Sequence, residues 1–196
     1  MDVLVGGPRD VRATLDGDER DACVVACPPH PQHRGSRSDE RLRAVSDALS
    51  ARGIDCLRID YGPWAEGAGE VRDAEQAVDH CVEALGYDRV ALFGYSFGGA
   101  VALLAATAVD VAAVSTLAPA RRLSDDLDAV AAVASLSVPL QVVFGGRDST
   151  VDCGPVVDAV RSRGGDVVEL PADHFFVGQA GKVGARVAPF LADALD

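Results

Sequence analysis

Short apolar runs rich in β-branched residues alternate with longer segments of helical periodicity from residue 21 to the end of the chain. Such runs, separated by helix-length segments, are typical of the strands of an α/β protein. They predict strands at residues 22–27, 54–60, 89–94, 111–117, 140–145 and 166–170. The intervening and final segments predict helices at residues 39–51, 70–85, 97–109, 124–134, 155–163 and 178–195.

Strands joined through helices need crossover connections, which are right-handed and place successive strands parallel. The pattern therefore predicts a three-layer α/β fold, a mostly parallel sheet with helices on both faces. Ahead of it, VLVGG and VRATLD predict two antiparallel edge strands that turn at Gly6, Gly7 and Pro8. Only one helix fits between the strands at 111–117 and 140–145, so no large lid is expected. The length of 196 residues predicts one domain, 1–196.

The chain is strongly acidic, with 30 acidic and 18 basic residues and a net charge of −12. This charge repels the phosphates of nucleic acids and anionic lipids, so neither is an expected partner. Lys182 is the single lysine, and Asp outnumbers Glu 23 to 7. Two explanations fit this composition. Dense carboxylates keep a surface hydrated in a hypersaline cytosol, and a GC-rich genome favours the same codons without any adaptation.

The sequence predicts a cytoplasmic protein. Its five cysteines are odd in number and lie in apolar contexts, which does not suggest a disulfide framework. The first 21 residues contain acids among few apolar residues and lack the hydrophobic region of a signal peptide. Asp110 interrupts the longest apolar run before it reaches the roughly 18 residues of a membrane span.

The segment GYSFGG, residues 94–99, joins a predicted strand to a predicted helix. A serine on such a sharp turn is strained, and the flanking glycines leave room for the strand and helix to cross. Ser96 is therefore a candidate nucleophile at the carboxyl end of the sheet. The helix dipole and the backbone N–H of Phe97 would face an oxyanion that develops there.

A serine nucleophile needs a base and an orienting carboxylate. Asp148 follows the predicted strand at 140–145, and His174 follows the one at 166–170. Parallel strands end at one edge of a sheet, so both side chains are expected beside Ser96, in the order Ser, Asp, His. Asp173 is a less suitable acid than Asp148, because adjacent residues on a tight loop rarely face each other. His80 lies in the middle of a predicted helix and has no such position.

Five segments together resemble the α/β-hydrolase superfamily, and more narrowly its small members related to dienelactone hydrolase. They are PPHPQHRG, RIDYGPW, GYSFGG, GGRD and ADHFF, which span most of the chain. The resemblance implies that the loop after the strand at 22–27 supplies a second oxyanion donor, the backbone N–H of Gln32, since Pro31 has none. The chain departs from the family pattern at Pro28, where His is common, and at Arg34, where Gly is common.

These features predict a serine hydrolase with a Ser-His-Asp triad that needs no cofactor. An open site without a large lid fits a small-molecule acyl substrate, an ester, thioester or lactone. The residues expected to flank it are His30, Tyr61, Trp64, Tyr95, Phe175 and Phe176. Perhydrolysis, carbon–carbon bond cleavage and a non-catalytic binding role on the same fold are the alternatives. The sequence is also compatible with a homo-oligomer.

Several other residues have side chains of types that occur in metal or nucleotide sites. Cys23, Cys27, His30 and His33 have the residue types of a zinc site, but sulfurs four residues apart on a strand are about 13 Å apart, too far for one ion. His30 and His33 fit equally as residues that hold their loop or contact substrate. No GxGxxG motif follows the first strand, which disfavours nucleotide binding. Three carboxylates are expected in the first turn of a helix that Ser124 caps, those of Asp125, Asp126 and Asp128.

The acidic composition predicts that salt stabilises the protein. Mutual repulsion of the carboxylates opposes the compact state, and screening strengthens as the Debye length falls from about 10 Å at 0.1 M to about 3 Å at 1 M salt. The Tm measured by circular dichroism should rise steeply up to 1 M KCl and continue to rise in multimolar KCl through hydration and apolar burial. A Tm that stays flat over this range would leave genome composition as the explanation.

Overall fold

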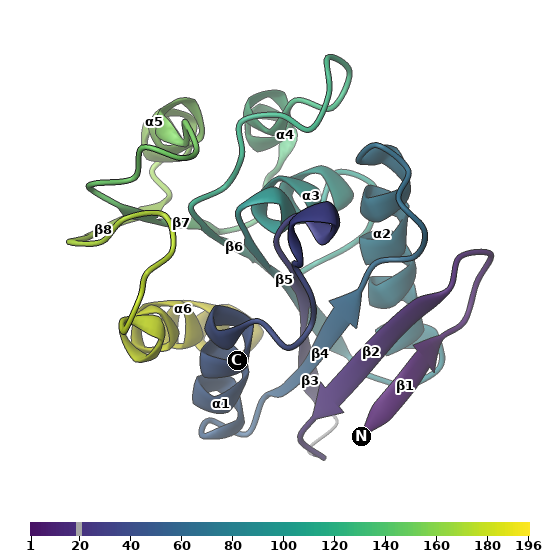
Figure 1. Ribbon diagram of the computed structural model, residues 1–196. Coiled ribbons are helices and arrows are strands. Elements are labelled where there is room, and N and C mark those ends of the chain that lie inside the picture. Colours follow the sequence, from purple (N-terminus) through teal and green to yellow (C-terminus); the bar gives the residue numbers. More distant parts are fainter. Residues whose placement is uncertain (19–20) are drawn as a thin grey trace.

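The computed structural model describes residues 1–18 and 21–196 and places them around one sheet (Figure 1). Among these residues the strands are β1 (Asp2–Val5), β2 (Val11–Asp16), β3 (Ala22–Cys27), β4 (Asp55–Asp60), β5 (Arg89–Tyr95), β6 (Val114–Leu117), β7 (Leu140–Gly145) and β8 (Asp166–Leu170). The helices are α1 (Glu40–Ser50), α2 (Ala68–Glu83), α3 (Phe97–Ala105), α4 (Ala129–Ser135), α5 (Gly154–Ser162), α6 (Ala180–Leu195) and the short 3₁₀ helix η1 (Pro31–His33).

The strand order is β1-β2-β4-β3-β5-β6-β7-β8. The six strands β4, β3, β5, β6, β7 and β8 pair parallel with one another in that order. At one edge, β1 pairs antiparallel with β2, and β2 pairs antiparallel with β4. The predicted three-layer α/β fold and the antiparallel edge strands are therefore confirmed. Only α4 lies between β6 and β7, in agreement with the expected absence of a large lid.

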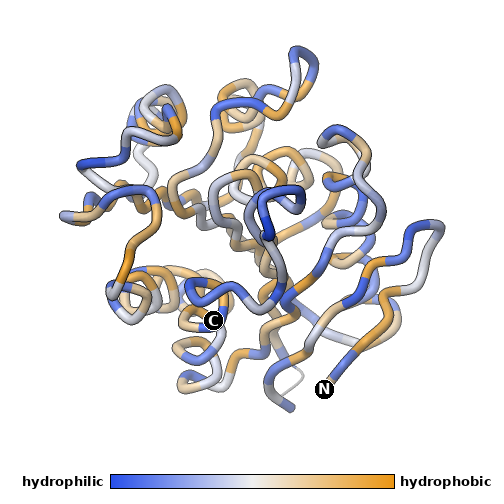
Figure 2. Tube along the Cα trace, in the orientation of Figure 1, coloured by the Kyte–Doolittle hydropathy of each residue, from blue (hydrophilic) through white to orange (hydrophobic). Residues whose placement is uncertain are grey.

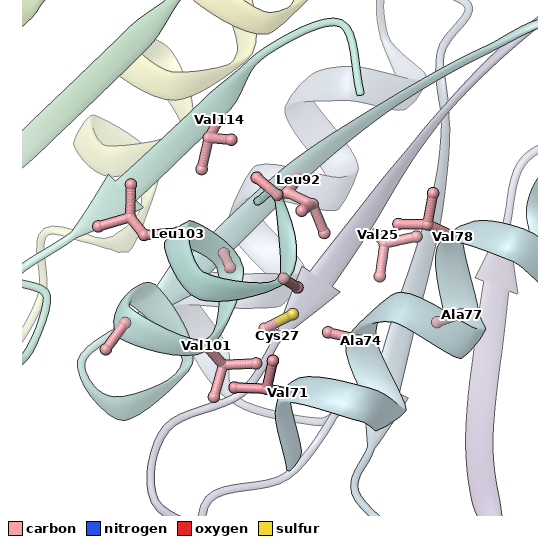
Figure 3. Packing of buried hydrophobic residues seen from close by; sticks show 14 of the residues in the cluster. Val25, Cys27, Val71, Ala74, Ala77, Val78, Leu92, Val101, Leu103 and Val114 are labelled. Carbon is pink, nitrogen blue, oxygen red and sulfur yellow. The ribbon is translucent and has the colours of Figure 1, made fainter. Parts of the chain in front are cut away.

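Both faces of the central strands are buried, because helices cover each face of the sheet there. Along β3, Cys23 and Val25 face the cluster formed with α2, α3, α4 and α5, while Val24 and Ala26 face α1 and α6. Figure 3 shows the first cluster, in which Val25 and the labelled side chains of α2 and α3 meet. The hydrophobic colour along the central strands in Figure 2 reflects this double burial. It also explains why these strands appear in the sequence as continuous apolar runs.

The predicted and observed elements differ most at α4 and α3. The prediction that Ser124 caps α4 is wrong: the cap is Asp128, whose Oδ1 accepts hydrogen bonds from the N–H groups of the second and third helical residues. Asp125 and Asp126 thus lie in the preceding loop. Helix α3 ends at Ala105 rather than residue 109, since the N–H and hydroxyl of Thr107 both donate to the Leu104 carbonyl.

Three further structural facts bear on the earlier expectations. All five cysteines are buried and carry free thiols. Within residues 1–18 and 21–196, no helix is both long enough and apolar enough to cross a membrane. Strand β6 also begins at Val114, three residues later than predicted, although Ala112 N–H already donates to the Val90 carbonyl of β5.

Helices α1 and α6 approach each other closely on one face of the sheet (Figure 1). Gly184 of α6 permits this approach, because a Cβ at that position would lie 2.5 Å from the carbonyl oxygen of Ala44 in α1. Gly181 of the same helix has no described atom within 4 Å of its Cβ position. The two glycines of α6 therefore differ sharply in what a Cβ would meet, which allows them to be compared.

Alanine at these two positions should have opposite effects on stability. Gly184→Ala forces the helices apart and should lower the free energy of unfolding by about 1–3 kcal/mol. Gly181→Ala adds no clash and restricts the unfolded chain, so it should raise that free energy by about 0.5–1 kcal/mol. Urea unfolding followed by circular dichroism measures both. Equal effects of the two substitutions would contradict the close helix approach.

Candidate active site

Ser96 lies on the sharp turn between β5 and α3, with φ 57° and ψ −115°. A side chain at a positive φ is strained, so the surrounding packing must hold the turn. Two glycines allow that packing. A Cβ on Gly94 would lie 2.0 Å from the carbonyl oxygen of Gly98, and a Cβ on Gly98 would lie 2.3 Å from that of Cys27 in β3. The predicted strand, strained serine and helix are therefore present in the structure.

His174 and Asp148 form a hydrogen-bonded line with Ser96. His174 Nε2 is 3.0 Å from Ser96 Oγ, and His174 Nδ1 is 2.7 Å from Asp148 Oδ2. Since an ionised carboxylate only accepts hydrogen bonds, we assign the ring proton to Nδ1, which leaves Nε2 to accept from the Ser96 hydroxyl. The His174 and Asp148 side chains are only 6% and 1% exposed. Three residues that are far apart in the sequence thus meet at the carboxyl end of the sheet.

The two candidate acids have different contacts. Asp148 Oδ1 accepts from the backbone N–H groups of Thr150 and Val151 at 2.9 and 3.1 Å, which leaves Oδ2 for His174. Asp173 instead accepts from the backbone N–H of Phe175 at 3.0 Å, within its own turn. The carboxylate at the strand end, and not the sequence neighbour, therefore contacts the imidazole.

The two backbone donors considered for an oxyanion have different surroundings. Phe97 is the first residue of α3, so its N–H has no carbonyl of that helix to bond. The N–H of Gln32 donates to His30 Nδ1 at 3.3 Å, and Gln32 does not line the cavity described next. Burial and the nearby His33 lower the pKa of His30, which favours the neutral ring that can accept this bond. In this structure the Gln32 N–H is thus engaged within its own loop.

A cavity of about 750 Å³ opens beside Ser96 and His174. Four of the six predicted flanking residues line it: His30, Trp64, Tyr95 and Phe175. Tyr61 does not, because it packs behind Phe97 with ring centroids 5.8 Å apart and its hydroxyl donates to the Pro28 carbonyl. Phe176 does not either, because it is fully buried in the core beside α1 and α6.

The loop that carries Trp64 is held by two buried carboxylates of α2. Glu70 accepts from the N–H groups of Ala65 and Gly67 at 2.9 and 2.8 Å. Asp73 accepts from Gly62 N–H at 2.9 Å and pairs with Arg9 Nε at 2.5 Å. Both carboxylates are fully buried, and these bonds offset the cost of burying their charge. The loop thereby presents Trp64 to His30 and Phe97, at ring-centroid distances of 4.8 and 5.8 Å.

The cavity is also lined by residues that the sequence did not indicate as part of the site. They include Arg41 from the first turn of α1 and Arg122 and Leu123 from the loop after β6. Each follows the carboxyl end of a parallel strand, which is the signal that could have found them. Arg34, noted as a departure from the family pattern, lines the cavity as well and has a left-handed φ of 67°.

The residues weighed as zinc ligands do not come together. Cys23 and Cys27 lie on β3, and the Cys23 sulfur is 3.8 Å from that of Cys81 in α2. His30 and His33 stack on each other in the loop beyond β3, with ring centroids 4.6 Å apart. In the part of the chain that the structure describes, no group of three or more His, Cys, Asp or Glu side chains could hold a metal ion.

The geometry agrees with a comparison of sequence families. The sequence model of the dienelactone hydrolase family matches residues 64–162, which include Ser96 and Asp148. The chain belongs to the dienelactone hydrolase family. No curated protein matches this family member by sequence.

Solved structures show the same fold for this dienelactone hydrolase family member. An α/β serine hydrolase homologue from Coxiella burnetii is 22% identical, with a TM-score of 0.82 and 97% of each chain covered. An α/β serine hydrolase without lid from Xanthomonas campestris is 22% identical, with a TM-score of 0.82 over 98% of this chain and 94% of that one. An esterase from Pyrococcus furiosus is 18% identical, with a TM-score of 0.82 over 98% and 90%. The family match supports a hydrolytic function, and these solved structures show the fold.

Proposed function

We propose that this chain is a serine hydrolase that cleaves small esters, thioesters or lactones through an acyl-enzyme intermediate. The observation that carries the proposal is the line from Ser96 Oγ through His174 to Asp148, with distances of 3.0 and 2.7 Å. Nucleophile, base and orienting carboxylate in that geometry are the groups that acyl transfer requires. The strained turn at Ser96 and the neighbouring helix N-terminus support the same chemistry.

The first half of the proposed reaction forms the acyl-enzyme. Ser96 Oγ attacks the acyl carbon as His174 Nε2 takes its proton, and the carbonyl oxygen becomes an oxyanion near the Phe97 N–H. The carboxylate of Asp148 stabilises the imidazolium. The bond to the leaving group then breaks, and the leaving oxygen or sulfur takes the proton from His174.

The second half returns the enzyme to its starting state. His174 removes a proton from a water molecule, whose oxygen attacks the acyl carbon of the Ser96 ester. The bond to Ser96 Oγ breaks, Ser96 recovers the proton from His174, and the acid leaves. Gln32 N–H can join the oxyanion site only after it leaves His30 Nδ1, which makes the η1 loop the part of the site that must adjust.

The cavity supports small acyl substrates. It has a volume of about 750 Å³, opens to solvent and has no covering domain, because α4 alone lies between β6 and β7. Its wall combines the rings of His30, Trp64 and Phe97 with the polar groups of the triad. This suits a compact acyl group that lies against the rings with its carbonyl carbon at Ser96.

The nucleophile is tested with a fluorophosphonate probe and a panel of p-nitrophenyl esters and thioesters. The probe should modify Ser96 and no other serine, as peptide mass spectrometry would show. Ser96→Ala should lose both labelling and hydrolysis while its circular dichroism spectrum is unchanged. Retention of esterase activity in this variant, or modification of another serine, would exclude the assignment.

The role of the acid is tested by comparing two aspartates. Asp148 contacts His174 in space, and Asp173 directly precedes it in the sequence. Asp148→Asn removes the orienting carboxylate and favours the wrong tautomer of His174, so kcat should fall by ~10⁴-fold. Asp173→Asn removes only a turn contact to Phe175 N–H and should cost far less. Steady-state kinetics on the best ester of the panel measures both. If the larger loss came from Asp173→Asn, the role of Asp148 would be wrong.

A further inference from the structure

His174 lies on a loop between β8 and α6, outside regular secondary structure. Its bond to Asp148 fixes the ring only if the backbone at residue 174 is also fixed. The loop is a tight one, since Phe176 has a left-handed φ of 49° and Asp173 accepts from the N–H of Phe175. Something outside the triad must therefore hold this loop against the sheet.

Tyr95 makes the first such contact. Its hydroxyl donates to the backbone carbonyl of His174 at 3.0 Å, and its ring lies 5.5 Å from the imidazole, centroid to centroid. Tyr95 is only 2% exposed, and burial raises its pKa to about 12, so the phenol keeps its proton and remains a donor. It also directly precedes Ser96. The strand that carries the nucleophile thus also holds the backbone of the base.

Arg41 makes the second contact. Its guanidinium carbon lies 4.8 Å from the centroid of the Tyr95 ring, and its Nη1 donates to the Phe175 carbonyl at 3.1 Å. On its other side it pairs with Asp39, the N-cap of α1. Its buried Nε has no hydrogen-bond partner among the described residues, so the ring face and the two acceptors determine where the guanidinium lies. Arg41 therefore joins α1, Tyr95 and the His174 loop.

We propose that Tyr95 and Arg41 are positioning residues for His174, which hold two successive backbone carbonyls of its loop and so set the distance from Nε2 to Ser96 Oγ. The proposal rests on the proposed function, in which His174 is the base. Tyr95 acts through the loop backbone, because its hydroxyl bonds to a carbonyl rather than to the imidazole. Losing either contact should misplace the base without removing any member of the triad.

Tyr95→Phe tests the hydroxyl alone, since the ring and its contact with Arg41 remain. The matched control is Tyr87→Phe: Tyr87 is 3% exposed, and its hydroxyl donates to Asp55 Oδ2 at 2.6 Å, away from the cavity. A small displacement of a catalytic group is costly, so kcat of Tyr95→Phe should fall about ten-fold or more while KM changes little. Its rate of fluorophosphonate labelling should fall in parallel. Tyr87→Phe should retain both rates even if it lowers Tm by a similar amount.

A second readout does not depend on turnover. The proton between His174 Nδ1 and Asp148 Oδ2 should give a low-field NMR signal that disappears in Asp148→Asn. In Tyr95→Phe this signal should shift upfield or broaden as the bond loosens, whereas Tyr87→Phe should leave it in place. Equal kcat and an unchanged signal in Tyr95→Phe would overturn the proposal. If Ser96→Ala kept its activity, the proposed function would fail, and the NMR comparison would still decide whether Tyr95 holds the loop.

Arg41 is tested with its own matched pair. Arg41→Lys keeps the charge but loses the planar group that spans the ring and two acceptors. Arg58→Lys is the control, because Arg58 likewise joins a carboxylate, that of Asp16, and a backbone carbonyl, that of Arg37. Arg41→Lys should lower kcat and shift the same NMR signal, and Arg58→Lys should do neither. The same response in both variants would exclude a specific role for Arg41.

Discussion

The site depends on how closely three pieces of backbone approach one another around Ser96. The turn at this residue has a positive φ, which costs of order 1–3 kcal/mol for a non-glycine residue. It persists because β5, the start of α3 and the end of β3 meet at Gly94 and Gly98, where no Cβ would fit. The Ser96 N–H donates to the Leu117 carbonyl of β6, and its carbonyl accepts from Ala120 N–H. The neighbouring strand thus also fixes the backbone of Ser96.

The same principle extends outward from Ser96, because side chains of nearby helices and strands hold two loops of the cavity. Glu70 and Asp73 of α2 accept hydrogen bonds from backbone N–H groups of the loop that carries Trp64. Tyr95 of β5 and Arg41 of α1 bond to the carbonyls of the loop that carries His174. Side chains of helices and strands thereby hold these loops in fixed positions. A site formed by loops has a precise geometry only if the loops are held in this way.

Much of this arrangement could be predicted from the sequence. Strands β3 and β7 match their predicted bounds, because burial on both faces produces an apolar run that ends where the chain leaves the sheet. Strand β8 also matches its predicted bounds, although it lies at the edge of the sheet and only Leu170 is buried. The proximity of Ser96, Asp148 and His174 could be predicted because parallel strands end at one edge. What could not be predicted depends on contacts between distant residues. Ser124 and Asp128 are both residue types that are favourable at a helix N-cap. In the structure Asp128 is the cap, and its backbone also forms an antiparallel bridge with that of Arg122. In the pair Phe175 and Phe176, nothing local indicates which ring is buried.

The backbone also determines which oxygen of Asp148 meets His174. Two N–H groups of the turn after β7 donate hydrogen bonds to Asp148 Oδ1, so Oδ2 remains to bond with Nδ1 of His174. With that bond the ring proton is assigned to Nδ1, which leaves Nε2 as the acceptor facing Ser96 Oγ. A series of hydrogen bonds therefore runs from the turn after β7 through Asp148 and His174 to Ser96 on β5. A loose connection anywhere along it would change the Ser96 to His174 distance, on which the proposed proton transfer depends.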